Sequence, residues 1–407
     1  MAEPDAPLLD GVTILDLTSM ISGPLATMML ADQGANVIKV ESPSGDYARH
    51  VATRRNGFSA SFVNNNRNKR SIVLDLKHPA GLDALRGLIR QADVMVQNFR
   101  PGVATRMGVG PEQAQEINPS LIYLSIAGFG FTGPFRDKPV FDPLIQALSG
   151  LTTIQGGADN TRPRLVRTIL PDKLTAMQAS QIILAALFAR ERQGGPGKRI
   201  ELSMLDTIVS FLWSSDMGGH TFVGEEVSSE TAQSFIDLIY ETRDGYVSIA
   251  VMQDKHWQGF LKAVGRRDLI EDARFATPAL REINKNERVE LIQSLVADNN
   301  TERLIDDLEA FDVPCSPVLT RSEMIQHPQI IANQIVGIHQ HPQAGALRQT
   351  RPAPQLANSS AFHPVGAPAL GQHTREVLIE SGMSEQAVNI LVETGAAICT
   401  QGGVDGR

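Results

Sequence analysis

The first 150 residues alternate short apolar runs with segments of helical spacing, and this alternation constrains the fold more than any other feature. Helical patterns at 24–33 and 79–91 separate strand-like runs at 12–17, 37–41, 71–76, 93–97 and 121–127. Such alternation predicts an α/β fold with a mostly parallel sheet and helices on its faces. Ligands usually bind beyond the carboxyl ends of the strands in sheets of this kind, so we expect the functional residues there.

The rest of the chain predicts a different organisation. A long helix is expected at 172–193, with Asp172 as its N-cap, followed by a strand and a helix up to Trp213. Two runs at 236–242 and 246–251 flank Arg243-Asp244-Gly245, which predicts a hairpin. Charged amphipathic helices follow to about 309, and a last helix at 374–394 is expected to pack back onto the first domain.

These patterns predict four regions. They are the N-terminal part of a large α/β domain (1–222), a small domain (223–325), an extended linker arm (326–370) and a C-terminal helix that returns to the large domain (371–407). The arm is predicted because residues 325–370 are rich in Pro, His and Gln and show little periodicity.

Charge and cysteine content exclude several classes of protein. The net charge of −8, from 37 basic and 45 acidic side chains, argues against general nucleic-acid binding. Cys315 and Cys399 are the only cysteines, too few for a disulfide scaffold or a Cys-rich zinc site. The N-terminus lacks the pattern of a signal peptide, and no apolar run approaches the ~20 residues that span a bilayer. We therefore expect a cytoplasmic protein without a membrane partner.

Two motifs favour structural interpretations. Gly128, Gly130 and Gly133 match G-x-G-x-x-G after a strand, but Pro134 follows where a dinucleotide site needs a helix. A flexible glycine loop is the better interpretation, and such a loop still serves an active site well. His339 and His341 alternate along a run without further ligands nearby, so we expect a solvated strand face and no metal.

Asp172 and a group of arginines are the candidates for chemistry. Asp172 follows Pro171 at the start of the long helix, where position alone fits either a plain N-cap or a carboxylate kept ionised as a nucleophile. Arg100 and Arg106 lie just past the strand at 93–97 and are suited to bind phosphate oxygens.

These residues lie within a wider resemblance. The chain resembles the family III (CaiB/BaiF-type) CoA-transferases, which include the 2-methylacyl-CoA racemases, over most of its length and in the expected order. The matching stretches are GVTILDLTSMISGPLATMMLADQGANVIKVESPSGD (11–46), NRNKRSIVLDLK (66–77), ADVMVQNFRPGVATRMGVG (92–110), NPSLIYLSIAGFGFTGP (118–134), FDPLIQALSG (141–150), PDKLTAMQASQIILAAL (171–187) and GKRIELSMLD (197–206).

The resemblance implies a fold and a mechanism. Family members have a large Rossmann-like parallel-sheet domain formed by both termini and a small α+β domain, in a ring-like chain that forms an interlocked homodimer. Asp172 occupies the position of the family nucleophile. Its carboxylate would attack an acyl-CoA thioester to form a mixed anhydride, then an aspartyl-CoA thioester, and the acceptor acid would leave as the new acyl-CoA.

The resemblance also implies contacts to coenzyme A. The residues carried over are Met20, Ile21 and Ser22 through their backbone, with Leu74, Lys77, Asn98, Phe99, Arg100, Arg106 and Met107, and Lys138 near the phosphates or the acyl site. Gly128, Gly130, Gly133 and Phe141 would form the active-site loop, and no metal is implied. The chain departs from the family pattern at Pro171, where Gly is frequent, at Ser42-Pro43, where a basic residue is frequent, and near 225–245, where a glycine-rich loop is absent. The last departure weighs against a formyl-CoA:oxalate transferase.

The alternatives are a racemase and a CoA-binding protein without turnover. The racemase members use a His where this chain has Phe141, which cannot move a proton, although His220 could replace it. Intact Asp172 argues against a protein without turnover, and an NAD-dependent dehydrogenase would rest on the glycine motif alone. Dicarboxylic acids are plausible substrates, with candidate carboxylate receptors at Arg49, Arg54, Arg55 and Arg167.

Overall fold

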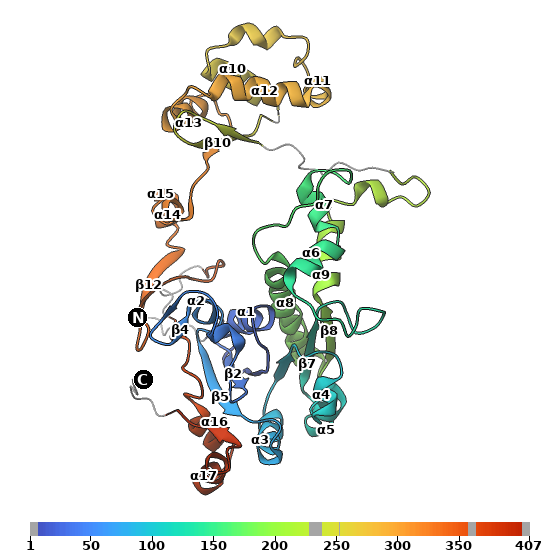
Figure 1. The fold of residues 1–407 in the computed structure, drawn as a ribbon, viewed down its shortest axis with the longest axis vertical. Coiled ribbons are helices and arrows are strands. Elements are labelled where there is room, and N and C mark those ends of the chain that lie inside the picture. Colours follow the sequence, from blue (N-terminus) through green and yellow to red (C-terminus); the bar gives the residue numbers. More distant parts are fainter. Residues whose placement is uncertain (1–6, 228–237, 252, 357–363, 401–407) are drawn as a thin grey trace. The chain divides into compact units, whose positions relative to one another are not determined.

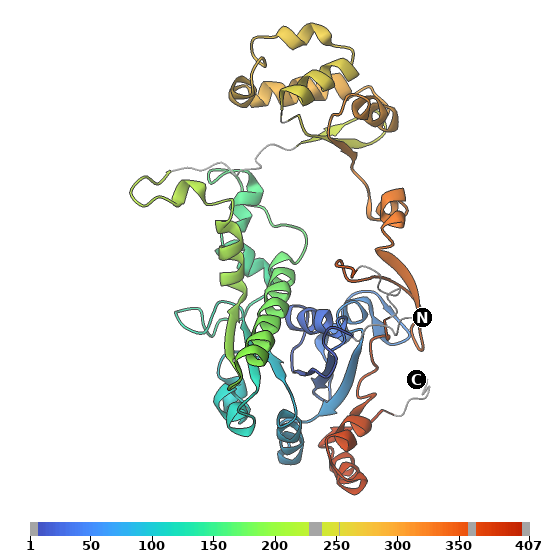
Figure 2. The same cartoon turned by 180° about the vertical axis from the view of Figure 1, so that it is seen from behind.

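The computed structural model describes residues 7–227, 238–251, 253–356 and 364–400 of the chain. The chain divides into two compact units, one made of Met1–Glu230 together with Ile335–Arg407 and the other of Thr231–Gln334. The first unit thus draws on both the early and the late part of the sequence, and it carries the large sheet visible in Figures 1 and 2.

The large sheet confirms the predicted α/β class. In the described part of the chain it has seven strands in the order β14-β5-β2-β1-β6-β7-β8, and all except β14 run parallel. The five early strands lie within two residues of their predicted ends. The bounds are β1 Thr13–Asp16, β2 Asn36–Glu41, β5 Lys69–Leu74, β6 Val94–Gln97, β7 Ile122–Ala127, β8 Arg199–Ser203 and β14 Ala397–Ile398.

Alternating side chains of these strands build two cores, one on each face of the sheet. On one face, Ile14 and Val96 pack against α1 (Ser22–Ala31) and α8 (Leu170–Gln193). On the other face, Leu15 and Met95 pack against helices that include α3 (Pro79–Ile89), α5 (Pro111–Ile117), α16 (Thr374–Glu380) and α17 (Glu385–Glu393). Burial on both faces explains why these strands read as nearly continuous apolar runs.

Shorter elements complete the first unit. They are η1 (Tyr47–Arg49), β3 (Arg54–Arg55), β4 (Phe58–Ser59), α2 (Ala60–Val63), α4 (Val103–Arg106), α6 (Asp142–Leu148), α7 (Leu151–Gly156), α9 (Met204–Trp213) and η2 (Gly218–His220). The predicted C-terminal helix is wrong as a single element. It breaks between α16 and α17 at Gly382, whose φ of 97° lies in the left-handed region that ends helices.

Part of the predicted arm forms a hairpin of β12 (Val336–His341) and β13 (Gly345–Thr350). Its turn is held by His341, whose Nδ1 accepts hydrogen bonds from the backbone amides of Gln343 and Ala344. The His341 ring is buried against Phe58, with 4.5 Å between ring centroids. The expectation that His341 is solvated is therefore wrong, because the hairpin folds onto the loop around β4 instead of running free.

The second unit is α+β. Its three-stranded sheet pairs β10 (Tyr246–Ile249) with β9 (Ile239–Glu241) and β11 (Cys315–Pro317), which confirms the hairpin around Arg243-Asp244-Gly245, although residues 236 and 237 lie outside the described residues. Trp257 is at the centre of its core. The helices are α10 (Asp254–Ala263), η3 (Arg267–Glu271), α11 (Pro278–Ile283), α12 (Lys285–Val296), α13 (Thr301–Glu309), α14 (Arg321–Met324) and α15 (Pro328–Ala332).

Candidate active site

The parallel strands bring loops from distant parts of the sequence to one edge of the large sheet. Leu15 pairs in register with Ile38 and Met95, so the loops that follow β1, β2 and β6 leave at the same edge. Helix α8 starts at this edge, because its far end returns to the opposite one, where Gly197 donates a backbone hydrogen bond to Pro119 just before β7. The carboxyl edge of the sheet is therefore where candidate residues meet.

Asp172 lies in the first turn of α8 at this edge. The helix begins at Leu170 with Ile169 as its N-cap, so the expectation that Asp172 is the N-cap is wrong. Pro171 at the second helical position starts the helix early, because its fixed φ suits a first turn and its missing N–H is not needed there. The Asp172 carboxylate is thereby left to interact with other parts of the chain.

Two neighbouring residues influence the protonation state of the Asp172 carboxyl group. Ser22, the first residue of α1, interacts with it through its hydroxyl and backbone amide, and Asp142, the first residue of α6, accepts a hydrogen bond from the Asp172 amide at 3.3 Å. Burial and the charge of Asp142 raise the pKa of Asp172 to about 6, against the lowering effect of Ser22. The site thus holds a carboxylate that is ionised at neutral pH but more basic than an ordinary Asp.

Position at a helix N-terminus explains only part of the environment that sets the pKa of Asp172. A helix N-terminus by itself favours the ionised form and would lower the pKa of Asp172. Removal from water and a second carboxylate outweigh that effect here. A more basic carboxylate is a better nucleophile, which supports the chemical role considered for Asp172.

Asp142 is the site residue that sequence reasoning missed. Its side chain is buried, and burial raises its pKa although Gln146 donates a hydrogen bond to Oδ1 at 2.7 Å. Gln146 in turn accepts a 3.0 Å hydrogen bond from the amide of Val166, which ties α6 to the segment before α8. The Asp-Pro pair at 142–143 signals a helix start, but nothing local shows that this helix starts beside Asp172.

The other residues carried over from the resemblance lie on the loops of the same edge. Asn98 follows β6 and exchanges two hydrogen bonds with the backbone of Ser19, at 3.0 and 2.9 Å. Phe99 and Met107 are partly buried against the core, and Leu74 is fully buried at the end of β5. Met20 and Ile21 lie between β1 and α1, directly before Ser22.

Four cations accompany these loops. Lys77, Arg100 and Arg106 are exposed, and within the described residues none of these three side chains makes an ion pair or hydrogen bond. The Nζ of Lys138 lies 3.3 Å from the centroid of the Phe135 ring in the loop after β7. A chain with a net charge of −8 therefore presents unpaired positive charge at the edge where Asp172 lies.

The segment 128–133 is a loop, as predicted, and no helix follows it until α6. A Cβ at Gly128 would lie 2.4 Å from the Val140 side chain, so only glycine permits this close approach. Gly130 has a φ of 114°, which other residues rarely adopt. Phe141, the last residue before α6, is 70% exposed.

Comparisons with known proteins show the family to which this chain belongs. A sequence model described as CoA-transferase family III matches residues 9–374. The chain belongs to this family. Succinyl-CoA:glutarate CoA-transferase of Mus musculus is 32% identical over 91% of this chain and 86% of its own length, and formyl-CoA:oxalate CoA-transferase of Streptomyces coelicolor is 31% identical over 96% and 99%. A CaiB/BaiF family protein from Brucella suis superimposes with a TM-score of 0.82 at 27% identity, over 93% of this chain and 100% of that one.

The arginines suggested as carboxylate receptors occupy different places in this CoA-transferase. Arg49 is buried and engaged, since it forms two 2.7 Å hydrogen bonds to Glu41 and stacks 3.6 Å from the Phe62 ring. It is therefore not available to a substrate. Arg167 is exposed in the segment before α8.

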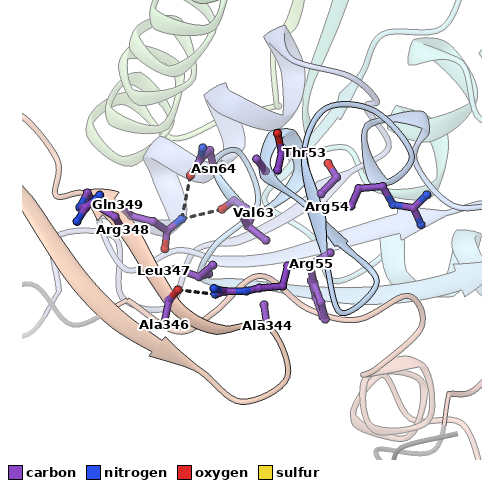
Figure 3. Close-up of a pocket in the computed structure, with 13 residues that line it drawn as sticks. Thr53, Arg54, Arg55, Val63, Asn64, Ala344, Ala346, Leu347, Arg348 and Gln349 are labelled. Carbon is purple, nitrogen blue, oxygen red and sulfur yellow. Dashed lines mark hydrogen bonds between the residues drawn. The ribbon is translucent and has the colours of Figure 1, made fainter. Parts of the chain in front are cut away.

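Arg54 and Arg55 line a pocket of about 270 Å³ between the loop that contains β3 and β4 and the hairpin β12–β13. Figure 3 shows Arg55 reaching the carbonyl of Ala346, while Arg54 and Arg348 point away to opposite sides. Their guanidinium groups do not converge on one point, so the pocket does not form an arginine clamp for a single carboxylate.

The described residues show neither a metal-binding cluster nor a membrane-spanning helix. Among residues 7–227, 238–251, 253–356 and 364–400, no group of three or more His, Cys, Asp or Glu side chains is arranged to hold a metal ion. Over the same residues, no helix combines the length and apolar character needed to cross a membrane.

Proposed function

We propose that this CoA-transferase uses Asp172 as its nucleophile. The proposal rests on the environment of the Asp172 carboxyl group, which is ionised at neutral pH and more basic than that of an ordinary Asp. The group lies at the edge of the sheet where α/β proteins bind ligands. A carboxylate with these properties is suited to attack an acyl group and later to leave it.

In the proposed transfer, Asp172 forms a series of covalent intermediates. The Asp172 carboxylate attacks the thioester carbonyl, the C–S bond breaks, and a mixed anhydride and CoA thiolate result. The thiolate attacks the Asp172 carbonyl, which releases the donor acid and leaves an aspartyl-CoA thioester. The acceptor carboxylate attacks this thioester, the C–S bond breaks, and a second mixed anhydride between Asp172 and the acceptor forms with release of CoA thiolate. The thiolate then attacks the acceptor's acyl carbon in this anhydride, which gives the new acyl-CoA and the free Asp172 carboxylate.

We propose that coenzyme A binds along the loops after β1, β5 and β6. The unpaired cations Lys77, Arg100 and Arg106 supply charge for its phosphates, and Lys138 joins them near the phosphates or the acyl group. Phe99 offers an apolar surface for the adenine, and Ser22, which ends the segment from Met20, interacts with Asp172. The flexible backbone at Gly128–Gly133 is the candidate donor for the developing oxyanion.

We propose a dicarboxylic acid as one substrate. Several relatives are named for such acids, among them succinyl-CoA:glutarate CoA-transferase and succinyl-CoA–D-citramalate CoA-transferase of Chloroflexus aurantiacus, which is 32% identical over 94% of this chain. Racemisation is not favoured, because Phe141 puts an exposed ring in the position before Asp142 and supplies no second base.

We also propose a homodimer, in which ring-like chains interlock. Its support is an apolar surface on α8 and α9, where Met177, Phe188, Phe211 and Trp213 are each about half or more exposed. Exposed apolar patches often mark protein contacts. If two chains interlock, tagged and untagged dimers will not exchange subunits unless they are first unfolded, whereas free exchange would contradict the interlocking.

Asp172→Ala tests the nucleophile. Succinyl-CoA serves as donor, with glutarate, oxalate and mesaconate as acceptors, and mass spectrometry detects new CoA esters. We expect wild type to transfer CoA and to carry a CoA adduct on the peptide containing Asp172 after incubation with succinyl-CoA alone. Asp172→Ala should lose both and keep its fold, while the control Asp10→Asn, at an exposed carboxylate, should keep both. Full transfer by Asp172→Ala would refute the assignment.

A further inference from the structure

The loop between β1 and α1 is held in place by side chains from outside it at each of its central residues. The Thr18 amide donates to Asp16 Oδ1 at 2.9 Å, and the Ser19 amide donates to Asn98 Oδ1 at 3.0 Å. The Met20 amide donates to Asp46 Oδ1 at 3.0 Å. A loop whose three central amides are held by side chains from outside it has little freedom of its own.

Met20 explains why such support is needed. Its φ of 70° lies in the left-handed region, which a residue with a long side chain rarely adopts. Such a conformation persists only where the surroundings impose it, and it is found often at functional sites. The close approach of Gly23 to Thr18, where a Cβ would lie 2.3 Å away, shows that the loop is tightly folded at the start of α1.

Asp46 and Lys39 form hydrogen bonds with the loop residues on either side of Ser19. Asp46 Oδ1 accepts hydrogen bonds from Met20 and, at 2.9 Å, from the amide of Ala48. Its Oδ2 lies 2.9 Å from Lys39 Nζ, and the same Nζ donates to the carbonyl of Thr18 at 2.9 Å. The ion pair thus fixes a carbonyl before Ser19 and an amide after it.

The pair belongs to a buried cluster in which charges balance. Three carboxylates and three cations, all buried, are in contact around this loop: Asp16, Glu41, Asp46, Lys39, Arg49 and Lys69. Burial alone would raise the pKa of Asp16, but Lys69 and Lys39 hold it well below its ordinary value. Asp16 therefore stays ionised, and the ion pairs of the cluster depend on one another.

The loop ends at Ser22, which is the residue that contacts Asp172. Any change in the turn at Met20 moves the start of α1, because Ser22 is its first residue. The hydroxyl and amide of Ser22 are the groups that favour the ionised form of Asp172, while Asp142 opposes it from α6. The position of the loop is thus coupled to the state of the nucleophile.

We propose that Asp46 is a positioning residue for CoA transfer, because it holds Met20 in the left-handed conformation that places Ser22 against Asp172. The inference rests on the proposed role of Asp172 and adds a role for residues that touch no substrate. Lys39 acts with Asp46, since it neutralises the carboxylate and holds the other side of the loop.

The test is the pH profile of kcat/KM for succinyl-CoA with glutarate. In Asp46→Ala, Ser22 loses its fixed position, so the acidic limb should move upward by about one pH unit. Direct electrostatics predicts the opposite sign, because removal of a negative charge stabilises a nearby carboxylate. The direction of the movement therefore separates positioning from a simple loss of charge.

Asp32→Asn is the matched control. Asp32 forms a buried ion pair with Arg67 at 2.6 Å at the other end of α1. Within the part of the chain that the structure describes, its side chain makes no hydrogen bond or ion pair with the loop between β1 and α1. Asp32→Asn should lower the melting temperature, as Asp46→Ala does, but should leave the pH profile of kcat/KM unchanged. If the profiles of Asp46→Ala and Asp32→Asn coincide, the inference is wrong.

Two further variants keep the result decisive. If Asp46→Ala does not fold, Asp46→Asn replaces it as the test. Asn keeps an acceptor for the Met20 amide but loses the ion pair with Lys39, which holds the Thr18 carbonyl, so we expect a smaller movement in the same direction. An unmoved profile overturns the inference. The double variant Met20→Gly/Asp46→Ala should have a kcat/KM several-fold higher than that of Asp46→Ala, since glycine adopts a positive φ without strain. Turnover by Asp172→Ala would instead refute the nucleophile, so the two failures are distinguishable.

Discussion

Replacing Asp172 by Asn should stabilise the folded protein at neutral pH, although it removes the proposed nucleophile. The physical reason is the environment of the carboxyl group. Burial and the charge of Asp142 raise its pKa from an ordinary 3.8 to about 6, so the folded state binds the proton more tightly than the unfolded state does. Above pH 6 the ionised carboxylate therefore costs the folded state free energy, and an uncharged side chain of the same shape avoids that cost.

The size of the effect follows from the two pKa values. They differ by about 2 pH units, and each unit corresponds to about 1.4 kcal/mol, so the cost reaches about 3 kcal/mol at pH 8. It declines as the pH falls through 6 towards 3.8, and it vanishes below the unfolded value because both states are then protonated. For a unit of this size, about 3 kcal/mol corresponds to a rise in melting temperature of roughly 4 °C.

Thermal unfolding of wild type and Asp172→Asn between pH 4 and pH 8 measures this effect. The difference in melting temperature should be largest at pH 8 and close to zero at pH 4. Asp10→Asn removes an exposed carboxylate from the same unit and should show no such trend. Equal or lower stability of Asp172→Asn at pH 8, or a difference independent of pH, would refute the environment described for Asp172.

Two further predictions concern activity. Asp142→Asn removes the charge that raises the pKa of Asp172, so the acidic limb of kcat/KM should move below pH 6, and a limb that stays or rises contradicts the coupling. Arg106→Gln should weaken acyl-CoA binding about fivefold at low salt and less at high salt, whereas Arg90→Gln, exposed at the end of α3, should not. Equal affinities at low salt would exclude the phosphate contact of Arg106.

Much of the fold was predictable because it depends on local patterns. Strands such as Val94–Gln97 are recognised in the sequence as apolar runs, because both faces of the sheet are covered. The intervening helices are recognised by the helical spacing of their apolar residues. The errors lie where local rules give no answer. The hairpin at Val336–Thr350 is stabilised by contacts of His341 and Gln349 with residues about 280 positions earlier, which no periodicity reveals.

The site divides in the same way. Asp172 was recognised from its place in a motif, as were the cations near β5 and β6. Its partners were not, because Asp142 and Ser22 reach it only when three helices begin at the same edge of the sheet. The raised pKa of Asp172 could not be predicted for this reason, since a helix terminus is visible in the sequence and a neighbouring carboxylate from another helix is not.

The sequence by itself determined the family and the class of fold and singled out Asp172 as the candidate nucleophile, since each depends on short stretches of the chain. Only the tertiary structure decided how basic that carboxylate is and what holds it in place. Both depend on charges brought together from distant positions, as in the cluster that joins Asp16 to Lys69 and Lys39 to Asp46. Electrostatic energies follow distance in space and removal from water, and neither quantity exists until the chain has folded.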